Sequence, residues 1–260
     1  MIGNSKQILC AGSVLWDVIG YTENVAGLGG DQGGNIIRRA GGVAFNIAQK
    51  LAELGERPKI LTVLGRDQDG GALCDICSDL GFDTRFVHIS EHLPTDQYIA
   101  IEDKNGLVAA ISDAYSLERE GHQILRILLD PKNKLLHSPQ EIILIIDGNF
   151  TQAQLAEMAQ NEALKEVTFY IVPASPDKAN RLRCFYNRPK TVLFCNLSEA
   201  EALLNSSLTN AQHAVEALFD CGFDRVVVTN GEKMACDGAK NIDMLYQTPA
   251  PLRLKRVTGA

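Results

Sequence analysis

Apolar positions along this chain follow two periods, and the clearer one predicts a helix. Between Val43 and Leu54 the apolar residues recur at intervals of three and four, which predicts a helix with one buried face. Gly41-Gly42 precedes this segment and Gly55 follows it, and a glycine directly after the last periodic residue is typical of a helix end. Glycines let a ligand approach the backbone, and a helix N-terminus presents free N–H groups. The same pattern also fits a tight turn before an ordinary core helix, so both interpretations stay open.

Short apolar runs between helical segments predict buried strands. The expected strands cover residues 7–21, 59–65, 85–89, 141–146, 167–172, 191–195 and 225–229, and Gly12 and Asp17 interrupt the first of them. Helices are expected at 70–80 and 118–129, and after three capping signals at Thr151, at Ser198–Glu201 and at Thr209–Gln212. This alternation of strands and helices predicts an α/β fold with a mainly parallel sheet and helices on both faces.

Two segments do not fit the alternation. Residues 23–35 are glycine-rich, and Asp103-Lys104-Asn105-Gly106 separates two β-type runs, which is the strongest hairpin signal in the chain. We expect these segments to form a small added sheet. Ligands of such folds lie beyond the carboxyl ends of the strands, where several polar residues follow predicted strands. These residues are Asp17, Asp147, Asn149, Asn196, Glu199 and Gly231.

Composition narrows the class of partner. The chain has 260 residues and a net charge of −7, which argues against non-specific binding to nucleic acids or anionic membranes. Its first residues lack the basic leader and long apolar core of a signal peptide, and no apolar run is long enough to span a membrane. The seven cysteines are scattered through apolar segments and are interpreted as reduced. These features predict a cytoplasmic protein.

Four short motifs occur in a characteristic order. They are Gly41-Gly42 with Asn46, Asn196-Leu-Ser-Glu199, Val228-Thr-Asn-Gly231 and Val257-Thr-Gly-Ala260. From about Gln7 to its last residue the chain resembles the ribokinase-like (PfkB) family of sugar and nucleoside kinases. Within that family, GGVAFNIAQKLAELG, Thr95–Tyr98, Ala109–Asp113 and Asp147-Gly-Asn149 are most similar to the bacterial pseudouridine kinases.

The resemblance implies an ATP-dependent kinase that phosphorylates the 5′-hydroxyl of a ribosyl compound, with pseudouridine as the first choice. It implies that Asp17 accepts hydrogen bonds from two ribose hydroxyls, a task suited to a carboxylate at a strand end. It also implies a set of substrate-binding residues around this carboxylate. The set is Asp17, Gly41, Gly42, Asn46, Tyr98 and Asn149.

A nucleotide site is implied by the later motifs. Asn196 and Glu199 would position Mg²⁺, with Glu199 acting through water, against the phosphates of ATP. Thr229 and Gly231 would line the ATP site, and the Gly259-Ala260 pair would begin an anion hole for the transferring phosphate. Whether a potassium ion binds near this anion hole stays open.

The implied domain division is an α/β core of residues 6–17, 41–92 and 114–260 with a β lid of residues 18–40 and 93–113. A lid excludes water that would compete for the phosphoryl group. The resemblance also suggests a homodimer formed through the lid, whose sheet edges would otherwise be exposed. The family's catalytic aspartate would come two residues after Ala260, so we expect the natural chain to continue past this point and to supply the last helices of the fold.

Several alternatives stay open. Asp17 could be a surface turn residue, and Asn196 and Glu199 could simply begin a helix that Ser198 caps. Leu15, Val172 and Met234 depart from the residues that many relatives carry. A sugar kinase, or an inactive relative that only binds a sugar or nucleoside, therefore competes with the leading hypothesis. A Rossmann dehydrogenase is disfavoured because no G-x-G-x-x-G follows the first strand.

Overall fold

An eight-stranded sheet forms the centre of the molecule, in a computed structural model that describes residues 6–25 and 31–250. Its strand order is β14-β13-β12-β11-β10-β9-β1-β4; the strands from β12 to β4 are parallel, and β13 and β14 are antiparallel additions at one edge. The predicted, mainly parallel sheet is confirmed. The strands are β1 (Gln7–Ala11), β4 (Lys59–Leu61), β9 (Ile142–Asp147), β10 (Thr168–Val172), β11 (Thr191–Asn196), β12 (Arg225–Asn230), β13 (Lys233–Ala239) and β14 (Ile242–Gln247).

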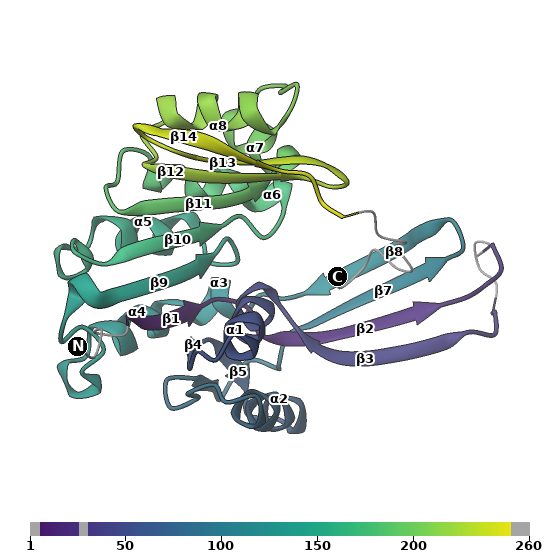
Figure 1. Cartoon of the computed structure of the whole chain (residues 1–260). Coiled ribbons are helices and arrows are strands. Elements are labelled where there is room, and N and C mark those ends of the chain that lie inside the picture. The colour runs from purple at the N-terminus through teal and green to yellow at the C-terminus, as the bar shows by residue number, and fades with distance from the viewer. Residues whose placement is uncertain (1–5, 26–30, 251–260) are drawn as a thin grey trace.

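A separate four-stranded sheet extends from the side of the molecule to which the arrowheads of β1, β9 and β10 point (Figure 1). We call it the small sheet; its order is β3-β2-β7-β8, from β2 (Leu15–Tyr21), β3 (Asn35–Gly41), β7 (Gln97–Asp103) and β8 (Gly106–Asp113). The predicted hairpin is confirmed, because Asp103 pairs with Gly106 and its Oδ1 accepts the backbone N–H of Asn105 at 2.7 Å. A two-stranded sheet joins β5 (Val63–Gly65) and β6 (His88–Ser90).

The first apolar run is interrupted at Gly12, as predicted, but not at Asp17. It divides at Gly12–Val14 into β1 and β2, which belong to different sheets. At the break the backbone N–H of Ser13 donates to the carboxylate of Asp147 instead of to a neighbouring strand. Asp17 therefore lies inside a strand of the small sheet and not at a strand end. The division into core and lid remains a prediction, and β2 runs through its boundary at residue 18; residues 26–30 of the glycine-rich segment lie outside the described residues.

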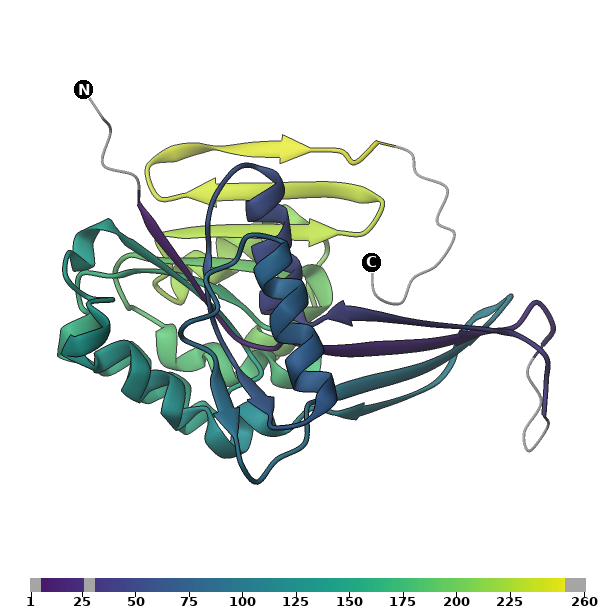
Figure 2. The same ribbon diagram turned by 90° about the horizontal axis from the view of Figure 1, so that it is seen from below.

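Helices cover both faces of the large sheet (Figures 1 and 2). On one face, α1 (Val43–Glu53) and α2 (Gln68–Asp79) pack on Cys10 and Ile145. On the other face, later helices pack on the alternate strand positions, such as Leu9 and Leu144. They are α3 (Ser116–Glu120), α4 (His122–Leu129), α5 (Gln152–Gln160), α6 (Pro176–Ala179), α7 (Leu197–Leu204) and α8 (Ala211–Asp220), with 3₁₀ turns η1 (Pro131–Asn133), η2 (Pro139–Glu141), η3 (Glu162–Leu164) and η4 (Asn180–Phe185).

The predicted helix cap at Thr151 is confirmed, and the one at Thr209 is wrong. Thr151 caps α5 in a reciprocal box with Gln154, as its sequence signal predicted. The cap of α8 is Asn210, not Thr209, and its Oδ1 accepts the N–H of His213 at 2.9 Å. The helix expected at 118–129 is two helices that meet at Gly121. Among the described residues, no helix has the length and apolarity needed to cross a membrane.

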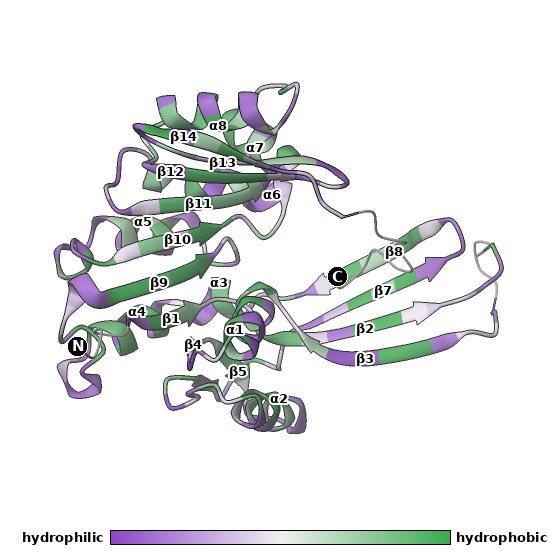
Figure 3. Cartoon of the chain, in the orientation of Figure 1, coloured by the Kyte–Doolittle hydropathy of each residue, from purple (hydrophilic) through white to green (hydrophobic). Residues whose placement is uncertain are grey.

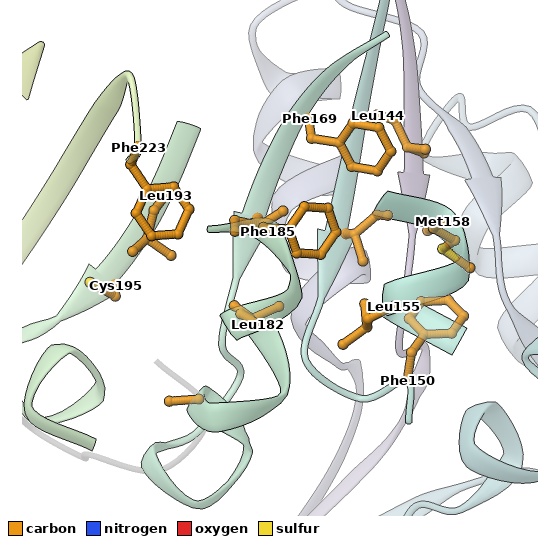
Figure 4. Packing of buried hydrophobic residues seen from close by; sticks show 14 of the residues in the cluster. Leu144, Phe150, Leu155, Met158, Phe169, Leu182, Phe185, Leu193, Cys195 and Phe223 are labelled. Atoms are coloured by element: carbon orange, nitrogen blue, oxygen red, sulfur yellow. The ribbon is translucent and has the colours of Figure 1, made fainter. Parts of the chain in front are cut away.

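The larger core packs around aromatic side chains between the sheet and its helices (Figure 4). Phe169 of β10 and Phe185 of η4 have ring centroids 5.4 Å apart, and both are fully buried with Leu144 and Leu193. The strands of the large sheet are mostly hydrophobic along their length (Figure 3), as expected where helices cover both faces. This rigid centre fixes the positions of the polar residues that follow its strands.

Candidate functional site

Asp17 stands between two side chains of neighbouring strands in the small sheet. The pairing register places Arg39 of β3 on one side of it and Tyr98 of β7 on the other. Arg39 Nε lies 3.9 Å from Asp17 Oδ2, and the Asp17 side chain keeps 12% of its surface exposed. Burial raises the pKa of Asp17, and the guanidinium of Arg39 opposes this rise. The predicted neighbours Asp17 and Tyr98 are thus brought together around a partly shielded carboxylate that still reaches solvent.

The two glycines before α1 are needed for close approaches of other groups. A Cβ on Gly41 would collide with the carboxylate of Asp17, so Gly41 gives this carboxylate its place. Gly42 is the N-cap of α1 with φ 98°, a conformation that favours glycine, and a Cβ there would collide with the carbonyl oxygen of Ser13. The glycine pair therefore brings the start of α1 against Asp17 and Ser13.

Asn46 is exposed on the first turns of α1 and does not join this cluster; within the described part of the chain no hydrogen bond links it to Asp17. It lines a hollow of about 1060 Å³ together with Trp16 and Arg39. Trp16 is buried, and its indole Nε1 donates to the carbonyl oxygen of Asp69 at 3.2 Å. Arg39 thus contacts Asp17 and also lines the hollow at Asn46, and a substrate-binding role of Asn46 remains a prediction.

A buried polar network lies where β1 and β9 end. Asp147 Oδ2 accepts the backbone N–H of Ser13 at 2.7 Å and its hydroxyl at 3.0 Å, while Oδ1 accepts the N–H of Asn149 at 2.9 Å. The Ser13 hydroxyl oxygen in turn accepts the N–H of Val43 at 2.9 Å. Burial raises the pKa of Asp147, against the effect of these donors. Gly12 has no room for a Cβ beside this carboxylate, so the network ties both strand ends to the start of α1.

Asn149, expected to bind substrate, has its side-chain amide engaged inside the protein. Its Nδ2 donates to Ser13 Oγ at 3.0 Å, and its Oδ1 accepts from Lys178 Nζ at 2.6 Å. The amide therefore links Ser13 to the ammonium of Lys178. A direct role of Asn149 toward substrate remains a prediction.

Asn196 and Glu199 form a reciprocal cap at the start of α7. Asn196 Oδ1 accepts the N–H of Glu199 at 2.9 Å, and Glu199 Oε2 accepts the N–H of Asn196 at 2.9 Å. The prediction that Ser198 caps this helix is wrong, because the Ser198 hydroxyl donates to Asn196 Oδ1. Burial raises the pKa of Glu199, which is 7% exposed. The pair therefore does begin the helix, as one of the two interpretations of the sequence had it, and Glu199 is buried at that position. A role of the pair toward Mg²⁺ remains a prediction.

Thr229 lies beside this cap. The parallel pairing of β11 with β12 sets Asn196 opposite Thr229, which is exposed at the carboxyl end of β12. Gly231 follows in the turn to β13 with φ 57°, and a Cβ on it would meet open space. The structure thus brings together Asn196, Glu199 and Thr229 at the carboxyl edge of the large sheet. Gly259 and Ala260 lie outside the described residues.

Comparison with known proteins decides which family this arrangement belongs to. Residues 5–243 match the pfkB family of carbohydrate kinases. The chain belongs to this family. It is 27% identical over 261 residues to the pseudouridine kinase of Escherichia coli (strain K12), a match that covers 97% of this chain and 79% of that protein. Kinases of the pfkB family use ATP to phosphorylate small sugar or nucleoside substrates.

Solved structures agree with this pfkB kinase in fold. A carbohydrate kinase from Agrobacterium tumefaciens has a TM-score of 0.75 at 24% identity, over 91% of this chain and 74% of that one. Arabidopsis thaliana ribokinase, complexed with ribose and ATP, has a TM-score of 0.74 at 17% identity, over 95% of this chain and 79% of that one. At these identities the likeness establishes the ribokinase-like fold.

Three polar residues of this pfkB kinase were missed by the sequence analysis. Ser13 gave a usable signal, because it is a hydroxyl residue inside a run of buried apolar positions. Arg39 and Lys178 gave none, since only the tertiary contacts distinguish them from other basic residues of the chain. Within residues 6–25 and 31–250, no group of three or more His, Cys, Asp or Glu side chains could hold a metal ion by itself.

Proposed function

We propose that this protein is an ATP-dependent kinase for the 5′-hydroxyl of a ribosyl compound, and that its acceptor is pseudouridine. The observation that carries the proposal is the setting of Asp17, a shielded carboxylate between Arg39 and Tyr98 with Gly41 beneath it. A carboxylate accepts hydrogen bonds from vicinal hydroxyls through its two oxygens, and charged acceptors make the stronger bonds. Asp17 would therefore hold the ribosyl group by its ring hydroxyls.

The reaction itself needs positioning and charge stabilisation more than covalent chemistry from the protein. The 5′-oxygen forms a bond to the terminal phosphorus of ATP, the bond from that phosphorus to ADP breaks, and ADP leaves with the electron pair. The hydroxyl proton passes to a carboxylate base, the role that the family resemblance gives to an aspartate. The small sheet extends from the carboxyl edge of the large sheet and would cover the acceptor, excluding water as a competing acceptor.

The nucleotide side of the proposal rests on the edge formed by β11 and β12. Thr229 is exposed there next to Asn196, and Gly231 leaves open space above its backbone. Magnesium suits this edge, because Mg²⁺ keeps several waters and takes few ligands directly from the protein. Glu199 would act through such waters, since Oε2 already accepts the Asn196 N–H. Magnesium supplies charge neutralisation of the phosphates when ATP is bound.

The choice of pseudouridine rests on resemblance and has a rival. The similarity to a pseudouridine kinase is matched by 27% identity to the uncharacterized sugar kinase YeiI of E. coli (strain K12), over 96% of this chain and 68% of that protein. A free sugar is therefore the second candidate acceptor. The phosphorylated product would be pseudouridine 5′-phosphate in the first case and a sugar phosphate in the second.

The test is ATP-dependent ADP release by the protein expressed from its natural gene, with pseudouridine, uridine, ribose and fructose compared. Each assay contains Mg²⁺ and is repeated with K⁺ exchanged for Na⁺. Turnover selective for pseudouridine supports the proposal, and selective turnover of a free sugar replaces it with the sugar kinase. Calorimetric binding of an acceptor without any turnover would instead support an inactive, ligand-binding relative.

A homodimer through the small sheet is part of the proposal. One face of this sheet carries four isoleucines that are each between 45% and 78% exposed: Ile36, Ile99, Ile101 and Ile111. The pairing register places the side chain of Asp17 on the other face of the sheet. Contiguous exposed apolar side chains are typical of interaction surfaces. A second copy of the chain fits this face, because a two-fold axis pairs a self-complementary apolar patch with itself.

A further inference from the structure

Lys178 is the one group of the Ser13–Asp147 network that brings a positive charge to the carboxyl edge of the sheet. It lies on α6, directly after β10, and its Nζ donates to Asn149 Oδ1 at 2.6 Å. Asn149 is in turn bonded to Ser13, which accepts the N–H of Val43 at the start of α1. A chain of three hydrogen bonds therefore fixes the ammonium relative to the helix start that Gly42 caps.

Within the described part of the chain Lys178 belongs to no ion pair; Asp147, Glu118 and Asp96 lie close enough to favour its charged form, but each is engaged elsewhere. Their partners are Ser13 and Asn149 for Asp147, Arg181 for Glu118, and Ser116 for Asp96.

The surroundings of Lys178 disfavour the charged form of its side chain. Burial is the largest influence on Lys178 and lowers its pKa, and the nearby Arg181 lowers it further. A half-buried charge whose nearest partner is a neutral amide is destabilising unless an anion completes its surroundings. An arginine in the same region shows the contrast, since Arg181 lies 2.7 Å from Glu118 and also donates to two backbone carbonyl oxygens.

We propose that Lys178 binds the terminal phosphate of ATP, with Asn149 as the residue that positions its ammonium. The inference rests on the proposed kinase function and adds a named group to it. Ammonium is a compact point charge with three donors, and it is a common partner of phosphate oxygens. The position suits this role, because Lys178 follows β10, which lies between the strand ends of β9 and β11 that carry Asn149 and Asn196.

The experiment compares two nucleotides that differ only at the terminal phosphate. Dissociation constants of Mg²⁺ with a non-hydrolysable ATP analogue, and of Mg²⁺ with ADP, are measured by calorimetry for the protein expressed from its natural gene and for Lys178→Met, Lys178→Arg and Lys165→Met. Lys165 is the matched control, because its side chain is 67% exposed and lies 3.9 Å from Glu162 on the surface. The ratio of the two dissociation constants is an internal control for folding, since misfolding would weaken the binding of both nucleotides.

We expect Lys178→Met to raise the dissociation constant of the ATP analogue by about tenfold to a hundredfold, the range of a charge-assisted hydrogen bond. The dissociation constant of ADP should change by less than about twofold. Lys178→Arg should restore most of the preference for the analogue, and Lys165→Met should match the unmodified protein. Asn149→Asp tests the positioning role, because a carboxylate beside Lys178 should neutralise it and lower the same preference while the ammonium is still present.

Equal losses for both nucleotides, or no change in either, would overturn the inference. The two proposals can fail separately. If the unmodified protein turns over an acceptor while Lys178→Met keeps the analogue preference, the kinase stands and the role of Lys178 falls. If no acceptor is turned over but the preference still collapses in Lys178→Met, the phosphate contact stands and the acceptor assignment falls.

Discussion

Glu199 allows the structural and the functional interpretations of one motif to be separated by mutation. The carboxylate is 7% exposed, and Oε2 accepts the N–H of Asn196 at 2.9 Å as half of the cap on α7. Glu199→Gln keeps a carbonyl oxygen for this hydrogen bond and removes only the charge. Glu199→Ala removes the hydrogen bond as well and leaves the Asn196 N–H inside the protein without its acceptor.

The expected stabilities follow from these contacts. Losing one side of the cap should cost Glu199→Ala about 1 to 2 kcal/mol of unfolding free energy, which lowers Tm by about 2–4 °C per kcal/mol in a domain of this size. Burial raises the pKa of Glu199 in the folded state, so its ionisation disfavours folding. That cost is absent below the unfolded pKa of about 4.3 and complete above the folded pKa. Glu199→Gln should therefore gain stability relative to the unmodified protein as pH rises through this window.

The kinetic assay is ADP release as a function of Mg²⁺ concentration, with thermal unfolding followed in parallel. If Glu199 orients water around the ion, Glu199→Gln should lower kcat or Mg²⁺ affinity by about tenfold to a hundredfold although its Tm is unchanged or higher. Asn210→Ala is the matched control, because it removes the cap of a different helix, α8, and leaves the Asn196–Glu199 pair in place. The reasoning is refuted if Glu199→Gln keeps the kcat and the Mg²⁺ dependence of the unmodified protein, since Glu199 would then serve only as a cap.

Three further predictions concern separate parts of the molecule. Asp17→Asn keeps the shape of the side chain but removes the charge, so kcat/KM for the acceptor should fall about tenfold to a hundredfold while the KM for ATP stays within about twofold in steady-state kinetics. Burial raises the pKa of Asp96 to about 6, and this carboxylate is bonded to Ser116. Its ionisation therefore costs stability as pH rises from about 4 to about 6, and Asp96→Asn should gain Tm over the unmodified protein across this range and not below it; a constant Tm difference at all pH values would contradict this. Ile111→Asp places a charge on a side chain that is 70% exposed, and it should convert a dimer to a monomer in sedimentation experiments with little change in Tm; a monomer before mutation would exclude the proposed dimer.

Local sequence signals determined much of the architecture. The helix after Gly41-Gly42, the apolar strand that ends at Asp147 and the hairpin at Asp103–Gly106 all appear as predicted, because each is specified by residues a few positions apart. The alternation of such elements was enough to predict the parallel sheet with two covered faces.

Local signals misled where a nearby alternative was equally good. At the start of α7 the chain offers Asn196 and Ser198 within three positions, and both types of side chain cap helices well. The structure selects Asn196, because β11 runs directly up to it and its backbone N–H then meets the carboxylate of Glu199. The same competition between neighbouring residues moved the cap of α8 from Thr209 to Asn210.

Only the tertiary structure decided how the polar residues are combined. Ser13 and Asp147 are 134 positions apart, and they meet because β1 and β9 pair in parallel and end together. The same folding breaks the first apolar run at Ser13, so that Asp17 lies inside the small sheet. Lys178 gained its place through an amide 29 positions away. The sequence by itself therefore determined the elements and the motifs of a kinase family, whereas contacts between distant segments determined which groups of those motifs face one another, because hydrophobic periodicity carries no record of which strands pair.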